Sequence, residues 1–74
     1  MKIELKLFVS LTQYGKELQT VDLPDGATVS DVVEMFKIPE NLPKLNILNN
    51  VHVKRDHVLK DGDVLALFPP IAGG

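Results

Sequence analysis

The chain has 74 residues, a net charge of −2 and no cysteine. This length is enough for a single domain, and a composition of 45% hydrophobic and 24% charged residues is ordinary for a globular protein. The charge gives no electrostatic reason for nucleic-acid binding. With no apolar run long enough to cross a bilayer and no signal-peptide pattern, we expect a cytoplasmic protein with neither a nucleic-acid nor a membrane partner. The lack of cysteine excludes disulfides, thiolate nucleophiles and cysteine-based metal sites.

The beginning of the chain predicts two strands. Hydrophobic residues alternate with other residues across positions 2–9, with the period of a strand, at Ile3, Leu5, Leu7 and Val9. A turn containing Gly15 follows, and a second strand is expected over residues 17–23. Because the connection is short, the two strands should form an antiparallel hairpin.

A helix is expected next, after the turn signal Pro24-Asp25-Gly26. Thr28 is a candidate N-cap, and Asp31 can complete a capping box. Hydrophobic residues then recur with the spacing of one buried helical face, at Val29, Val32, Val33 and Phe36. The helix should end before Pro39, because the residue before a proline avoids the α region.

Three more strands are predicted, over residues 45–48, 51–54 and 64–68, with turns at Asn49-Asn50 and Asp61-Gly62-Asp63. The first and last strands should lie side by side and parallel, since the helix supplies the crossover that such a pair needs. The predicted fold is an α+β domain over residues 1–68 of the β-grasp type. In this fold, a mixed sheet of four to five strands carries one main helix on one face.

The sequence ends in Phe68-Pro69-Pro70-Ile71-Ala72-Gly73-Gly74. Proline lacks a backbone N–H and fixes φ, so Pro69 and Pro70 cannot continue a central strand and favour an extended backbone. Fully extended, residues 69–74 would reach about 20 Å. We therefore expect these residues to form a thin arm that carries a carboxylate on Gly74 into the active site of another protein. The alternative is an ordinary frayed terminus.

Three segments carry a resemblance to a known family: Leu-Pro-Asp-Gly-Ala-Thr-Val at 23–29, Leu-Lys-Asp-Gly-Asp at 59–63, and the ending at 68–74. With the order of elements, they resemble the ubiquitin-like sulfur carriers of the MoaD/ThiS family over the whole chain. Within this family the chain is most similar to MoaD, the small subunit of molybdopterin synthase. The Phe-Pro-Pro-x-x-Gly-Gly ending distinguishes MoaD from the thiamine-pathway carriers, which usually reach their Gly-Gly without Phe-Pro-Pro.

The resemblance implies a sequence of reactions at Gly74. An E1-like adenylyltransferase would adenylate its carboxylate with ATP, and a sulfur donor protein would displace AMP to leave a thiocarboxylate. The carrier would dock on the large subunit of molybdopterin synthase, in a heterotetramer, and pass sulfur to a pterin precursor. It would bind no cofactor itself and would not be catalytic alone. Gly73 and Gly74 would allow a close backbone approach in the partner's tunnel.

A docking surface is expected beside the arm. By alternation, Phe68 and Ala66 should point to the sheet face opposite the helix, and we expect Phe8 to join them from the adjacent strand. Exposed aromatic residues with apolar neighbours suggest an interface. We predict that the partner contacts this face and the arm, through Phe8, Ala66, Phe68, Pro69, Pro70, Ile71 and Ala72. The alternative is that Phe68 folds back over the edge of the core.

The other polar features predict no metal site. His52 and His57 have no third ligand arranged nearby and are interpreted as surface residues. Lys54, Arg55 and Lys60 form a small basic cluster, either for an acidic partner or as a solvated edge. The segment 61–63 looks like a fragment of a calcium loop but lacks its later glutamate, which favours a turn.

The sulfur acceptor stays open. The segment 37–44 is shorter than in most small subunits of molybdopterin synthase, which raises the alternatives of thiamine thiazole, cysteine, tRNA or a tungsten cofactor. A hypothesis of a different class is a β-grasp modifier or interaction module without sulfur chemistry.

Overall fold

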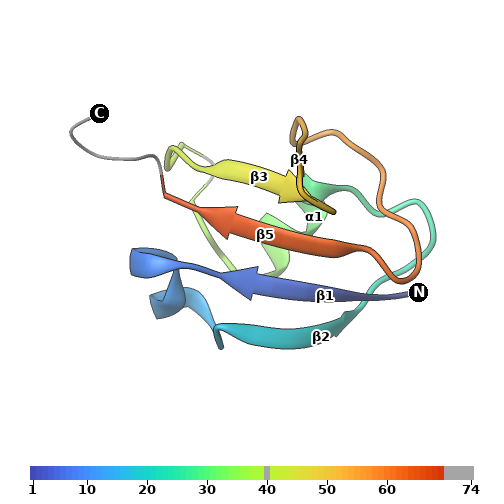
Figure 1. Ribbon diagram of the computed structural model, residues 1–74, viewed down its shortest axis with the longest axis horizontal. Helices are drawn as coiled ribbons and strands as arrows, with labels where there is room; N and C mark the ends of the chain where they lie inside the picture. Colours follow the sequence, from blue (N-terminus) through green and yellow to red (C-terminus); the bar gives the residue numbers. More distant parts are fainter. Residues whose placement is uncertain (40, 70–74) are drawn as a thin grey trace.

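The computed structural model describes residues 1–39 and 41–69. In chain order the elements are β1 (Lys2–Leu7), the 3-10 helix η1 (Val9–Tyr14), β2 (Leu18–Asp22), α1 (Val29–Met35), β3 (Leu45–Leu48), β4 (Val51–His52) and β5 (Val64–Phe68) (Figure 1). The predictions made for Pro70, Ile71, Ala72, Gly73 and Gly74 lie outside the described residues. Within the described ranges, no helix has the length and apolar character needed to span a membrane.

The strands form one mixed sheet in the order β2-β1-β5-β3-β4. β1 and β5 pair in parallel, with Leu5 opposite Leu65 and Leu7 opposite Leu67. The other pairs are antiparallel. The parallel pair of first and last strands is thus confirmed, as is the predicted β-grasp arrangement of a mixed sheet with one main helix.

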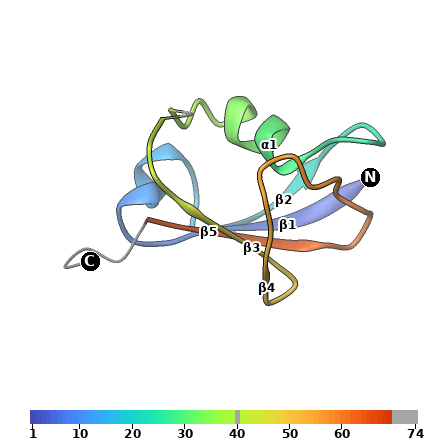
Figure 2. The same ribbon diagram turned by 90° about the horizontal axis from the view of Figure 1, so that it is seen from above.

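One face of the sheet is covered by α1 and η1 (Figure 2). Between these layers lies a hydrophobic core whose largest members are less than 2% exposed: Ile3, Leu5, Leu7, Leu11, Val29, Val32, Val33, Leu65 and Leu67. In the described part of the chain neither helix lies on the opposite face of the sheet, which leaves that face open to solvent or to a partner.

The start of α1 is the predicted capping box. The Oγ1 of Thr28 accepts a hydrogen bond from the backbone N–H of Asp31 at 3.3 Å, and Oδ2 of Asp31 accepts from the N–H of Thr28 at 2.8 Å. These reciprocal bonds satisfy two donors that the first turn leaves unpaired. Val29, Val32 and Val33 are buried as expected, whereas Phe36 is only half-buried at the C-cap.

The end of α1 has the hydrogen bonds of a Schellman motif. The N–H of Ile38 donates to the carbonyl of Val33 at 3.0 Å, and the N–H of Lys37 donates to that of Glu34 at 2.9 Å. Lys37 adopts a left-handed conformation with φ of 58°. The helix therefore ends before Pro39, as predicted.

The first strand is shorter than the predicted range 2–9. β1 ends at Leu7, and Val9, which was expected to face the core, is 75% exposed with φ of 54°. The chain turns there into η1, which brings Leu11 into the core at 1% exposure. The antiparallel β1–β2 hairpin is confirmed, but its connection contains this helix. β2 and β4 are also shorter than the predicted ranges 17–23 and 51–54.

Candidate functional site

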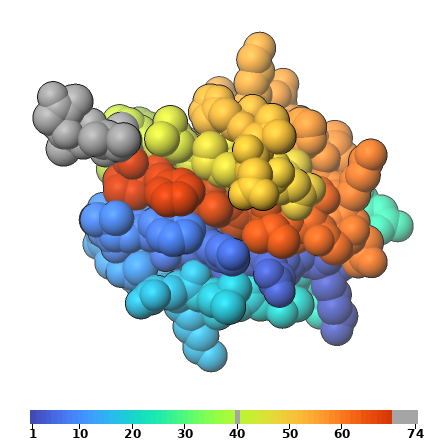
Figure 3. Space-filling model, viewed as in Figure 1, coloured from blue at the N-terminus to red at the C-terminus, as the bar shows by residue number. Residues whose placement is uncertain are grey.

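The helix-free face of the sheet contains a hollow of about 400 Å³. Figure 3 shows this face, with β5 lying between β1 and β3. Because side chains alternate across a strand, residues next to those of the core point here. The hollow is lined by Lys6, Phe8, Ile47, Asn49, Asn50, Val64, Ala66 and Phe68. The residues of the hollow therefore come from β1 and its end, β3, β5 and the turn between β3 and β4.

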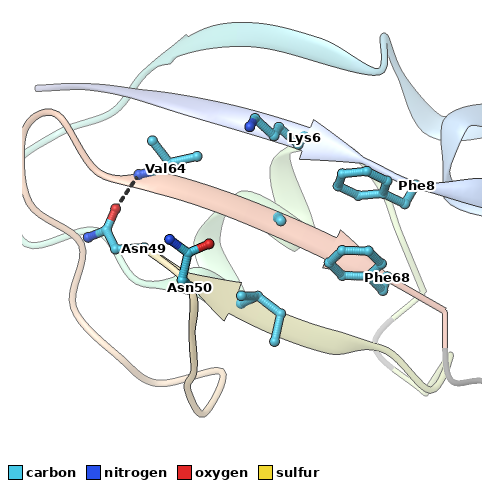
Figure 4. Close-up of a pocket in the computed structure, with 8 residues that line it drawn as sticks. Lys6, Phe8, Asn49, Asn50, Val64 and Phe68 are labelled. Carbon is cyan, nitrogen blue, oxygen red and sulfur yellow. Dashed lines mark hydrogen bonds between the residues drawn. The ribbon is translucent and has the colours of Figure 1, made fainter.

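The rings of Phe8 and Phe68 stack at one end of the hollow (Figure 4). Their centroids are 4.2 Å apart and the planes differ by 6°. Phe8 lies just beyond β1, where its N–H donates to the carbonyl of Leu67 at 3.1 Å, and Phe68 is the last residue of β5. Both rings are half-buried, and neither belongs to the core cluster of the described residues. Phe68 thus faces outward beside Phe8 and Ala66, as predicted, and does not fold over the core edge.

The other end of the hollow is polar. Asn49 and Asn50 have φ of 49° and 71° and form the tight turn between β3 and β4, which asparagine tolerates better than most residues. The Oδ1 of Asn49 accepts from the N–H of Val64 at 2.9 Å, and its Nδ2 donates to Oδ1 of Asp63 at 2.9 Å. The backbone N–H of Asn49 also donates to the carbonyl of Val64 at 2.9 Å. This asparagine therefore locks the β3–β4 turn onto β5.

The segment 61–63 has the turn role predicted for it. Oδ1 of Asp61 accepts from the N–H of Lys2 at 2.7 Å, and Oδ2 of Asp63 accepts from the N–H of Lys60 at 2.8 Å. Gly62 supplies a φ of 87°, which suits glycine. The Asp61 carboxylate thus binds the backbone at the start of β1, and the Asp63 carboxylate binds the backbone of the turn that precedes β5. Within residues 1–39 and 41–69, no group of three or more His, Cys, Asp or Glu side chains is placed to hold a metal ion.

The remaining polar candidates lie away from this hollow. His52 and His57 are exposed. Lys54 and Arg55 line a separate depression beside β4, together with His52, whereas Lys60 is not among its lining residues. The role of the predicted basic cluster stays a prediction.

Sequence reasoning missed part of the hollow, above all Lys6, Ile47 and Asn49. Their placement depends on strand register: Ala66 has Lys6 opposite it on one side and Ile47 on the other. Alternation within the first strand already indicated that Lys6 points away from the core. Which residues of other strands would surround it followed only from the pairing.

The fold and this face define a class of protein, the small ubiquitin-like carriers and modifiers of β-grasp fold. The family model described as the ThiS family matches residues 5–74, and the chain belongs to this family. The resemblance to MoaD/ThiS carriers found in the sequence is thereby confirmed.

Three relatives show the range of this group. Small archaeal modifier protein 3 of Haloferax volcanii is 30% identical over 92 aligned positions, covering 100% of both chains. A Pyrococcus furiosus protein assigned as molybdopterin converting factor subunit 1 has a TM-score of 0.80 and 30% identity, covering 96% of this chain and 99% of its own. A Helicobacter pylori complex of subunits 1 and 2 of molybdopterin-converting factor contains a chain with a TM-score of 0.68, 25% identity and 100% coverage of both.

Proposed function

We propose that this protein is a sulfur carrier that serves as the small subunit of molybdopterin synthase. One observation carries the proposal: the family match extends to residue 74, so Gly73 and Gly74 belong to the shared part of the chain. The Phe68-Pro69-Pro70 sequence and the likeness to two molybdopterin converting factor subunits support the pterin precursor as the sulfur acceptor.

The proposed chemistry takes place at Gly74 and on partner proteins. The Gly74 carboxylate attacks the α-phosphate of ATP on an E1-like adenylyltransferase, pyrophosphate leaves, and an acyl-adenylate forms. The terminal sulfur of a persulfide on the sulfur donor protein then attacks the carbonyl carbon and AMP leaves. A thiol reductant cleaves the resulting acyl disulfide to release the thiocarboxylate. Adenylation is needed because a carboxylate is a poor electrophile. The resulting thiocarboxylate is a nucleophile that donates its sulfur without releasing free sulfide.

The open face of the sheet has the character of a docking site for these partners. It offers an aromatic pair and an apolar hollow beside the residue from which the arm continues, and aromatic residues are enriched at the centres of interfaces. The Helicobacter pylori subunit 1 was solved with subunit 2. We propose that the large subunit of molybdopterin synthase contacts Phe8, Ala66 and Phe68 in this chain while Gly74 enters its active site.

A second candidate function is protein modification. It is favoured by the 30% identity to small archaeal modifier protein 3 over its full length. In this reading Gly74 is activated in the same way, but a lysine amine of a target protein displaces AMP and an isopeptide bond forms.

The two functions are separated by following Gly74 after activation. The purified chain is incubated with ATP, the E1-like adenylyltransferase and the sulfur donor of its own organism, and its mass is measured. We expect one oxygen to be replaced by sulfur, and dithiolene to form when the large subunit and the pterin precursor are added. A chain without Gly74 is the control. Thiocarboxylate without dithiolene would indicate another acceptor, and conjugates through lysine without thiocarboxylate would indicate the modifier.

A further inference from the structure

We propose that Lys6 is a specificity-determining cation of the docking face, which pairs with a carboxylate that the E1-like adenylyltransferase presents next to an apolar side chain. This inference rests on the proposed function and adds to it the chemistry of the partner's surface. Lys6 lies in the strand beside β5 and lines the hollow together with the Phe8–Phe68 pair (Figure 4).

Among the described residues, Lys6 has no counter-ion. Its neighbours opposite on the sheet are Leu18 in β2 and Ala66 in β5, both apolar. Glu4 lies two positions along the same strand, but it is opposite Thr20 and Val64. In the described part of the chain, the Lys6 ammonium has no hydrogen-bond or ionic partner.

Covering such a cation with a partner surface costs free energy. Lys6 is half-buried and lines the hollow. A lysine in such a place lays its methylene stem along apolar surface and keeps its ammonium in water. A wholly apolar partner surface would remove water from this charge without replacing the lost interactions, which is costly. A surface with a carboxylate at this point would instead form a charge-assisted hydrogen bond. Lys6 thus favours a partner surface with a carboxylate at this point and weakens the binding of wholly apolar surfaces.

The lining of the hollow and the net charge of the chain restrict the chemistry of the partner's surface. The lining of the hollow is apolar at Phe68 and Ile47 and polar at Asn50 and Lys6, a combination that fits an apolar side chain next to a carboxylate. The whole chain has a net charge of −2, so overall charge does not draw it to an acidic surface. Attraction must therefore be local, and Lys6 supplies it beside the apolar lining of the hollow.

The arm continues from a residue that lines the hollow. The hollow lies on the face to which Phe68, the last residue of β5, contributes its ring. An enzyme that adenylates Gly74 has to hold residues 69–74 while it binds the domain, so its surface continues from the arm onto this face. In the proposed reaction order the adenylyltransferase is the first partner that must bind the domain and the arm together, and we assign the carboxylate to it.

The test uses ATP–pyrophosphate exchange by the E1-like adenylyltransferase of the same organism, measured against the concentration of the carrier. We expect Lys6→Met to raise the half-saturating carrier concentration about tenfold, and Lys6→Glu about a hundredfold, because the first removes an ion pair and the second sets two carboxylates against each other. Lys6→Met should also flatten the salt dependence. Lys2→Met is the matched control, since Lys2 lies in the same strand, is exposed and does not line the hollow.

The possible outcomes distinguish a failure of the proposed role of Lys6 from a failure of the proposed function. If Lys6→Met and Lys6→Glu give the curves of the wild type while remaining folded by circular dichroism, Lys6 is not a recognition residue, although the proposed activation of Gly74 stands. An equal effect of Lys2→Met would overturn the proposal too, because the response would be to overall charge. If the wild-type chain supports no exchange, the proposed function itself fails and this inference fails with it.

Discussion

At the scale of single residues, we expect Phe68 to contribute more to partner binding than to the stability of the fold. Its ring is half-buried and stacked on Phe8 outside the core. We expect Phe68→Ala to lower the free energy of unfolding by only about 1–2 kcal/mol, from the lost ring pair and some apolar burial. Binding to the adenylyltransferase should weaken by about 2 kcal/mol or more, as for a central aromatic anchor. Calorimetry measures the change in binding free energy, and urea unfolding measures the change in the free energy of unfolding.

Leu67→Ala is the matched control for Phe68→Ala. Leu67 is the preceding residue of β5 but is 0% exposed in the core. Its truncation should cost about 2–5 kcal/mol of stability through a cavity, and it should weaken binding only as far as it unfolds the chain. Equal losses of stability and binding for Phe68→Ala would instead make Phe68 a structural residue.

Asn49 gives a second prediction at this scale. Its side chain makes two hydrogen bonds, to Val64 and Asp63, although it is exposed, as is the neighbouring Asn50, and both residues have positive φ. Alanine at either position must adopt the same left-handed backbone conformation, so the backbone strain lowers the stability of both variants alike. At about 1 kcal/mol for each lost hydrogen bond, Asn49→Ala should be less stable than Asn50→Ala by about 2 kcal/mol in urea unfolding. Equal stabilities would show that the Asn49 side chain does not hold the β3–β4 turn.

At the scale of elements, the end of α1 contains a residue that the backbone does not suit. Lys37 occupies the position where the Schellman motif usually has glycine, with φ of 58°. Lys37→Gly should therefore raise the free energy of unfolding by about 1 kcal/mol, because glycine adopts this conformation without a steric cost. In a chain of this size the midpoint of thermal unfolding should rise by about 4–8 °C. Lys37→Ala keeps the strained backbone and should give no such gain; equal stabilities for the two variants would contradict the prediction.

How far the sequence could predict these elements depends on whether the signal is local. The capping box of Thr28 and Asp31 and the alternation in β5 are local, and both were predicted correctly. η1 was missed because Val9 continues the alternating pattern of β1, whereas burial of Leu11 in the core decides the path of the chain. Lys6 was missed as a site residue because only its pairing opposite Ala66, far along the sequence, places it in the hollow.

At the scale of the whole molecule, folding and chemistry are expected to occupy different parts of the chain. The buried core of the described residues lies between Ile3 and Leu67, and the last strand ends at Phe68. The reaction is proposed at Gly74. The docking face belongs to the folded part, so binding and reaction should be separable by substitution.

Gly73→Val tests this separation directly. We expect its thermal unfolding to match the wild type within a few degrees, since no core residue changes, and its thiocarboxylate formation to be abolished, since a branched side chain should clash where the partner's tunnel requires glycine. The variant should still compete with the wild-type chain for the adenylyltransferase, because its docking face is intact. Adding Phe68→Ala to Gly73→Val should remove this competition. If Gly73→Val neither forms thiocarboxylate nor competes, the arm supplies most of the binding energy, and the open face of the sheet is not the main docking surface.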